Sequence, residues 1–404
     1  MKPKIPRTGE RQAVLDARRN LKMAQSAHAY VRGNTLKFYE WLESTERGSL
    51  PEGPPIWICG DCHLGNLGPV ANAKGNVEIA IRDLDQTVIG NPAHDLIRLA
   101  LSLATAVRGS DLPGVTTARM LERMIEGYQE ALSTKSSKGK ASGSPTKPIR
   151  FVLKQALSRN WRHLAEERIE GVSPSIPLGE RFWALSKEEK REVRRVFETE
   201  SVRKLITGLQ RRDDDDDIEV LDCAYWMKGC SSLGRLRYAV LLRVGKGDHK
   251  KAGLCLIDLK EAGKAAAPRY ADAAMPRDNA KRVVEGACKL SPYLGQRMLP
   301  ITFLDRPVVV RELLPQDLKL EMDQLTSEEA VESARFLAGV VGRAHASQLD
   351  AKSQNQWRSE LNHSRSKGLN APSWLWRSVV DLISIHERAY LEHCRQFASS
   401  AEKT

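Results

Sequence analysis

Two short stretches near the start of the chain carry side chains that could do chemistry together. The sequence GDCHLGN, residues 60–66, places the carboxylate of Asp61 five positions before the amide of Asn66, and Asp83 and Asp85 follow a strand-like run shortly afterwards. In phosphoryl transfer one Asp orients or deprotonates the acceptor hydroxyl, while an amide and a further carboxylate hold Mg²⁺ on the nucleotide phosphates. The spacing therefore predicts Asp61 in the first role and Asn66 and Asp83 in the second. Asp85 is either a further metal ligand or a hydrogen-bonded turn residue.

A glycine-rich loop and a lysine much further along the chain supply the rest of such a site. Residues 229–234 (GCSSLG) have the spacing of a G-x-G-x-x-G loop with serine at the middle glycine, and a strand-like run follows them. A following strand favours a kinase-type phosphate flap over a dinucleotide fingerprint, which needs a helix. Lys260 ends the next strand-like run, where it can reach phosphates and act as a catalytic residue.

Two further residues complete the predicted nucleotide site. Glu285 lies on a predicted helix over 280–290, and we expect it to pair with Lys260. Taken singly, either residue could simply lie on the surface. Residues 309–314 are expected to be the edge strand and hinge that cup an adenine through backbone groups. The predicted nucleotide-binding residues are Gly229, Ser231, Ser232, Gly234, Lys260, Glu285 and Glu312.

The hydrophobic periodicity predicts the elements that position these residues. Two helices broken near Gly33 are expected over 12–45, strands over 56–58 and 77–81, and a helix over 95–107. Strands follow over 238–244, 254–259 and 308–313, and capping boxes at 186–189 and 326–329 open two helices. A last helix is expected over 374–397. The predicted divisions are 1–133, a linker over 134–148, a helical segment over 149–217, a β-rich part over 218–320 and a helical part over 321–404.

The composition restricts the class of protein. The chain has 404 residues, 41% of them hydrophobic and 28% charged, which excludes whole-chain disorder and predicts a soluble globular protein. Its net charge of +12 suits an acidic partner such as a nucleotide, or reflects only a basic surface. Seven cysteines are too few for a disulfide framework, and no leader or membrane-spanning run is visible. A cytoplasmic protein without membrane contact is expected.

Several motifs together resemble one bacterial family, catalogued as domain of unknown function 2252. They are residues 30–33 (YVRG), 60–66, 83–87 (DLDQT), 229–234, 259–262 (LKEA) and 342–346 (GRAHA). That family looks like a relative of the aminoglycoside and choline phosphotransferases, whose G-D-x-H-x-x-N and G-x-P-x-x-D-L segments are similar to residues 60–66 and 90–96. In ordinary kinases the glycine loop precedes the catalytic loop, so the order here is permuted.

The resemblance implies specific roles. It makes Asp61 the catalytic base, Asn66 and Asp83 metal ligands, and Asp95 a structural carboxylate that braces the catalytic loop. Ser231 departs from the family, which tends to have glycine there. The implied fold is an α+β, protein-kinase-like two-lobe fold, circularly permuted, with a β-rich small lobe and a helical large lobe. ATP and Mg²⁺ (or Mn²⁺) would bind between the lobes.

The expected activity is a kinase-like phosphotransferase that acts on an unknown hydroxyl acceptor, either a small molecule or a protein. Alternatives are a nucleotide-binding pseudokinase, a nucleotidyltransferase, or a basic nucleic-acid-binding module. Aromatic residues are sparse beside the basic runs, so the nucleic-acid module ranks below the enzyme. Arg32 could clamp a phosphate or cap a helix. His63 and His345 are expected to be buried structural residues, and the acidic run 213–217 a solvated loop rather than a metal cluster.

Overall fold

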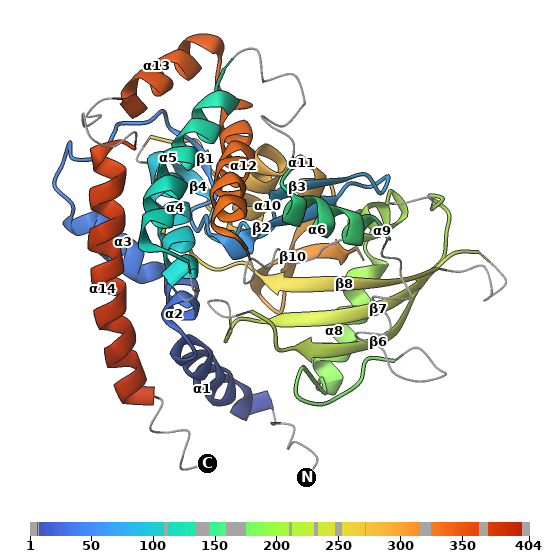
Figure 1. Cartoon of the computed structure of the whole chain (residues 1–404). Coiled ribbons are helices and arrows are strands. Elements are labelled where there is room, and N and C mark those ends of the chain that lie inside the picture. Colours follow the sequence, from blue (N-terminus) through green and yellow to red (C-terminus); the bar gives the residue numbers. More distant parts are fainter. Residues whose placement is uncertain are drawn as a thin grey trace.

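The computed structural model has a helical part and a part built on one large sheet (Figure 1). It describes residues 6, 8–108, 112–133, 145–158, 175–209, 212–229, 233–246, 253–270, 272–314, 325–362 and 371–397. The fold is therefore of the predicted α+β class. None of the described helices combines the length and the apolar character needed to cross a bilayer.

Six antiparallel strands form the large sheet, in the order β5-β6-β7-β8-β10-β9. They are β5 (Phe182–Trp183), β6 (Ile218–Trp226), β7 (Arg237–Val244), β8 (Gly253–Glu261), β9 (Met298–Phe303) and β10 (Arg306–Leu313). The strands predicted over 238–244, 254–259 and 308–313 are thus confirmed as β7, β8 and β10. Strand β5 lies inside the segment that was predicted to be helical.

The prediction that residues 309–314 form an edge strand is wrong, because β10 lies between β8 and β9. Strand β9 was missed for two reasons. It contains Pro300, and a proline makes a segment a weaker strand candidate, although an edge strand tolerates one. Its turn into β10 also uses Leu304 and Asp305 at positive φ, where sequence rules look for Gly or Asn.

Side chains alternate along the strands, so the sheet has two different faces. On one face Val240 and Ile257 belong to an apolar core with α8 (Lys187–Glu198) and α9 (Glu200–Thr207). On the other face, which is turned towards the helical part, cross-strand partners bring together four charged residues: Arg237, Asp258, Lys260 and Arg311. The charged face is where the sheet meets the candidate site.

The helical part is assembled from both ends of the chain, with α10 and α11 between it and the sheet (Figure 1). Its helices are α1 (Arg11–Ala24), α2 (Ala27–Gly33), α3 (Thr35–Ser44), α4 (Ala93–Arg108), α5 (Gly114–Ala131), α6 (Lys147–Ser158), α12 (Ser327–Ala346), α13 (Ala351–Asn362) and α14 (Ser373–Phe397). The helices α10 (Asn279–Leu290) and α11 (Pro292–Gly295) precede β9. Two-stranded sheets pair β1 (Ile56–Ile58) with β4 (Val88–Gly90) and β2 (Leu67–Ala71) with β3 (Val77–Ile81).

Short-range capping decides where several helices begin. Both predicted capping boxes are present, at Ser186 and Thr326. The N-terminal segment contains three helices rather than the predicted two. The extra break comes from Ser26, whose side chain accepts the N–H of Ala29 and starts α2, while Asn34 caps α3.

Two predicted loops have different outcomes. Residues 134–144 of the predicted linker lie outside the described residues, and α6 begins at Lys147, inside the predicted linker. In the acidic run the side chains are exposed except for that of Asp216, and Asp215 pairs with Lys246. Within the described residues no group of three or more His, Cys, Asp or Glu side chains is arranged to hold a metal ion.

Helices α5 and α12 pack closely because glycines lie at their contact. A Cβ built on Gly127 would lie 2.1 Å from the carbonyl oxygen of Arg335, and one on Gly342 would lie 2.9 Å from that of Tyr128. Real Cβ atoms do not approach backbone oxygens so closely, so a side chain at Gly127 would push the two helices apart.

We expect Gly127→Ala to lower the free energy of unfolding by about 1–3 kcal/mol, because the overpacked helices must separate. Urea unfolding measures this. Gly114→Ala on the same helix is the matched control, since nothing lies within 4 Å of its Cβ position, and it should change stability by less than about 0.5 kcal/mol. Equal effects of the two substitutions would contradict the packing argument.

Candidate active site

A buried carboxylate holds the start of the Gly60–Asn66 loop. Asp95, fully buried on α4, accepts the backbone N–H groups of Cys59 at 2.7 Å and Gly60 at 2.9 Å. Gly60 has φ of +74°, and a Cβ there would lie 2.1 Å from the carbonyl oxygen of Gln86. The prediction of Asp95 as a structural brace for this loop is confirmed by these contacts.

Asp95 is itself fixed by a chain of buried groups from three helices. Nε2 of His345 on α12 lies 3.1 Å from Asp95, and Nδ1 lies 2.8 Å from the hydroxyl of Tyr128 on α5. Nε1 of Trp357 on α13 donates to that same hydroxyl at 3.0 Å. Every member of the chain has a partner, which satisfies polar groups that would otherwise be costly to bury. His345 is therefore the structural residue that the sequence predicted.

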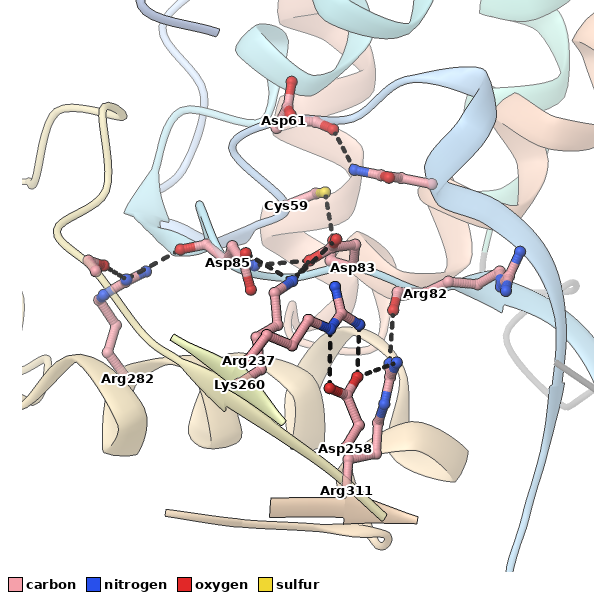
Figure 2. A network of polar contacts seen from close by, with 12 residues as sticks. Cys59, Asp61, Arg82, Asp83, Asp85, Arg237, Asp258, Lys260, Arg282 and Arg311 are labelled. Carbon is pink, nitrogen blue, oxygen red and sulfur yellow. Dashed lines mark hydrogen bonds and ion pairs between the residues drawn. The ribbon is translucent and has the colours of Figure 1, made fainter. Parts of the chain in front are cut away.

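Asp61 lies in the loop but apart from the cluster around Lys260 (Figure 2). Its Oδ1 accepts from Nε of the fully buried Arg98 at 2.9 Å, and its Oδ2 lies 3.7 Å from Nε2 of His63. Asn66 donates from its side-chain amide to the Asp61 carbonyl at 3.0 Å, which leaves its amide oxygen to bind a cation. Asp61 is only 6% exposed, so an acceptor can reach its Oδ2 only if the parts of the protein that cover it move.

Lys260 meets the two carboxylates of the loop after β3. Its Nζ lies 3.2 Å from both oxygens of Asp83 and 2.7 Å from Oδ2 of Asp85, although Asp83 is 177 positions away in the sequence. The β2–β3 register places Asn66 opposite Arg82, so Asn66 and Asp83 lie at the same end of that hairpin. The structure thus brings together residues from the two halves of the predicted site (Figure 2).

The two carboxylates differ in how easily they take up a proton. Burial alone would raise the pKa of Asp83, but the positive charges of Lys260, Arg311 and Arg237 outweigh it and hold that pKa well below its usual range. Burial and the neighbouring charge of Asp83 raise the pKa of Asp85, against the influence of Lys260. Asp83 is thus the more firmly ionised of the pair.

Arg282 on α10 links the segment that follows β8 to the loop that carries Asp83 and Asp85. Its guanidinium donates to the carbonyls of Asp85 at 3.0 Å and Gly263 at 2.9 Å, and also to that of Thr87. We expected α10 to contribute Glu285 as a partner of Lys260. It contributes Arg282 instead, which binds backbone carbonyls.

Two predicted nucleotide-binding side chains point elsewhere. Glu285 is exposed on α10, and the ion pairs described for Lys260 are with Asp83 and Asp85, so the expected Lys260–Glu285 pair is wrong. Glu312 is buried and pairs with Arg212 at 2.8 Å. Because strand side chains alternate, Glu312 lies on the sheet face opposite Lys260.

The glycine-rich loop joins β6 to β7, as the strand-loop-strand prediction required. Gly229 and Gly234 have φ of +105° and +102°, which favours glycine at both positions. Lys22 of α1 donates to the Gly229 carbonyl at 2.9 Å. The other two predicted residues of the loop, Ser231 and Ser232, lie outside the described residues.

Sequence reasoning missed the other charged groups that line the site. The cleft beside Asp83, Asp85 and Lys260 is also lined by Asp258 and Arg311, and by the apolar side chains of Val283, Leu294, Met298 and Val309. Asp258 precedes Lys260 by two positions, so strand periodicity alone could have placed it on the same face. The cavity measures about 30 Å³, room for about one or two water molecules, so phosphates fit only if the cleft opens.

The donor set suits a hard divalent cation. Two carboxylates and an amide oxygen are the ligand types that Mg²⁺ accepts, usually with water and substrate phosphate completing its shell. Asp83, Asp85 and Asn66 provide these oxygens at one end of the β2–β3 hairpin. With Lys260 in its present position, a cation would compete with the ammonium group for the same carboxylates.

The buried His63 makes stability depend on pH. Burial lowers the pKa of His63 to about 4, whereas an unfolded histidine titrates near 6.5. The contribution of neutral His63 to the free energy of unfolding is therefore complete above about pH 6.5. It is lost as the pH falls towards about 4, which lowers the free energy of unfolding by roughly 3 kcal/mol. Urea unfolding across this range should show His63→Gln with a shallower pH dependence than the wild type.

His386→Gln, on α14, is a second variant of the same kind, because burial also lowers the pKa of His386 to about 4. An unchanged pH dependence in His63→Gln would mean that His63 has the same pKa in the native state as in the unfolded chain.

Comparison with known proteins gives a family and nothing more specific. The profile of a family described as "Uncharacterized protein conserved in bacteria (DUF2252)" matches residues 11–396. No curated protein matches the chain, and no solved structure does. Since the match spans nearly the whole chain, including the Asp61 loop and Lys260, this protein belongs to the bacterial family called domain of unknown function 2252.

Proposed function

We propose that this protein is an ATP- and Mg²⁺-dependent phosphotransferase with a circularly permuted, kinase-like two-lobe fold. The observation that carries the proposal is the contact of Lys260 with Asp83 and Asp85. A lysine on a sheet strand and a carboxylate that holds the metal are the two groups that kinases place around the nucleotide phosphates. Here they come from segments that the sequence identified separately.

The sheet supports the proposal. The hairpin of β6 and β7 carries the glycine loop, β8 carries Lys260, and β10 lies beside β8. Helix α10 separates β8 from β9 in the chain, as the helix after the lysine strand does in a kinase small lobe. The arrangement resembles that lobe, with an arginine of α10 in contact with the carboxylate loop.

The contact between helices α1 and α14 is compatible with permutation. Helices α1 and α14 pack together: the hydroxyl of Tyr390 donates to the carbonyl of Ala24 at 3.2 Å, and His393 contacts that of Asn20 at 2.8 Å. When the ends of a chain lie close together at the surface, they can be rejoined elsewhere without changing the core.

The roles follow from the contacts. Lys260 would hold the phosphates of the donor, and Asn66, Asp83 and Asp85 would hold the cation. A bound Mg²⁺ would neutralise charge on the transferred phosphoryl group. Asp61, whose Oδ1 is held by Arg98, would accept the proton of the acceptor hydroxyl at Oδ2. Catalysis would then come mainly from positioning and electrostatics. Nucleotidyl transfer is the alternative chemistry, and the mass added to the acceptor distinguishes the two.

Mg-ATP should raise the melting temperature of the wild type, because a ligand that binds only the native state stabilises it by mass action. Lys260→Ala should lose most of that shift. The matched control is Lys264→Ala, an exposed lysine four positions further on, which should keep it. The shift is measured for each variant against its own melting temperature without ligand. No shift of the wild type at millimolar Mg-ATP would argue against the nucleotide site.

Asp61→Asn and Asp83→Asn should have different effects. Asp61→Asn is expected to lower the rate of Mg-ATP hydrolysis by about 10²- to 10⁴-fold while keeping nucleotide affinity, since it removes a proton acceptor. Asp83→Asn should weaken Mg²⁺-dependent nucleotide binding, which calorimetric titration with and without Mg²⁺ measures. The reverse pattern would show that the two roles are exchanged. A large loss of stability in Asp61→Asn would instead assign the Arg98 pair a structural role.

A further inference from the structure

The sheet face that lines the cleft carries positive charge from more residues than Lys260 alone. Strand register pairs Arg237 with Lys260 and Arg311 with Asp258, and cross-strand partners share a face. Three cations therefore lie on one face with a single carboxylate among them. Their charges lie beside the candidate metal site, because Nζ of Lys260 is 3.2 Å from Asp83 and Arg311 donates to the carbonyl of Arg82, the residue before Asp83.

Asp258 fixes the two arginines in place. It accepts from Nε of Arg237 at 2.9 Å and from Nη2 at 2.5 Å, and it lies 3.4 Å from Nη2 of Arg311 (Figure 2). The other terminal nitrogen of Arg311 donates to the carbonyl of Arg82 at 3.3 Å, next to Asp83. Asp258 is 1% exposed. Planar guanidinium groups held in this way are preorganised to bind phosphate oxygens, and Arg is the residue best suited to that geometry.

The position of Asp258 differs from the usual kinase pattern. In the V-A-I-K motif the residue two positions before the lysine is alanine, a small apolar side chain. Here the same position holds a carboxylate with two arginines, so the sheet next to Lys260 is charged rather than apolar. A flat, uncharged base would have to displace part of this cluster to stack there, and desolvating a buried charge is costly.

The apolar area further along the same face is already covered by the chain itself. Leu256 and Leu313 continue the face beyond Asp258, and both are buried in a cluster with Ile176, Phe182 and Trp226. The face is thus charged near Lys260 and packed with side chains beyond it.

We infer that the phosphoryl donor is recognised through its phosphate chain, by Lys260, Arg311 and Arg237, and hardly through its base. This inference rests on the proposed function and specifies its donor as any linear triphosphate, nucleotide or inorganic. In transfer from tripolyphosphate, the acceptor oxygen forms a bond to the terminal phosphorus and the bridging P–O bond breaks. Pyrophosphate leaves, and the hydroxyl proton goes to Asp61.

Calorimetric titration of the full chain with Mg-ATP, Mg-GTP and Mg-tripolyphosphate tests this. We expect the three dissociation constants to agree within about threefold. Arg311→Gln should weaken all three by about tenfold or more, since it removes a charge-assisted contact. Arg311→Lys keeps the charge but not the planar guanidinium with its several donors, so its dissociation constants should lie between those of Arg311→Gln and the wild type. Arg243→Gln, on the same face of β7 but paired with Glu219 at the far end, is the control and should bind normally.

Binding of ATP about thirtyfold or more tighter than tripolyphosphate would overturn the inference and leave the proposed function standing. Unchanged binding in a folded Arg311→Gln, checked by its melting temperature, would also overturn it. If none of the three ligands binds the wild type, the inference and the proposed function both fail.

Discussion

The ion pairs of Lys260 with Asp83 and Asp85 are the interaction on which the candidate site depends. They join the large sheet to the loop that follows β3. Two carboxylates this close together repel each other, and the lysine compensates for that repulsion. A divalent cation would provide the same compensation, so this arrangement of the two carboxylates suits either Lys260 or a bound cation as their partner.

The loop with Asp61 is rigid for a separate reason. Its amides donate to Asp95, which is held in turn through His345, Tyr128 and Trp357. Low dielectric strengthens such a chain while every member has a partner, and makes any unpaired member costly. The loop is therefore positioned by the helical part, whereas the cluster around Lys260 joins the sheet to the loop that follows β3.

Several charged groups of the described residues are buried as arginine–carboxylate pairs. Those with both partners largely buried are Arg11–Glu189, Arg98–Asp61, Arg212–Glu312 and Arg237–Asp258. Such pairs add little net stability, because desolvation offsets the attraction, but removing one partner is costly. They restrict which arrangement of strands and helices is acceptable. On the charged sheet face, the same property keeps Arg237 and Arg311 in a fixed orientation towards the cleft.

The sequence by itself determined the features that depend on neighbouring residues. The capping boxes at Ser186 and Thr326, the strands around Lys260 and the helix that carries Asp95 are local patterns, because hydrogen bonds and side-chain periodicity within a few residues specify them. The tertiary structure alone decided the partners. It gave Lys260 the carboxylates of Asp83 and Asp85 in place of Glu285, because which segments meet depends on packing between residues 177 positions apart. It also turned Glu312 away from the cleft and put β9 outside β10, since alternation along a strand tells which side chains share a face but not what that face meets.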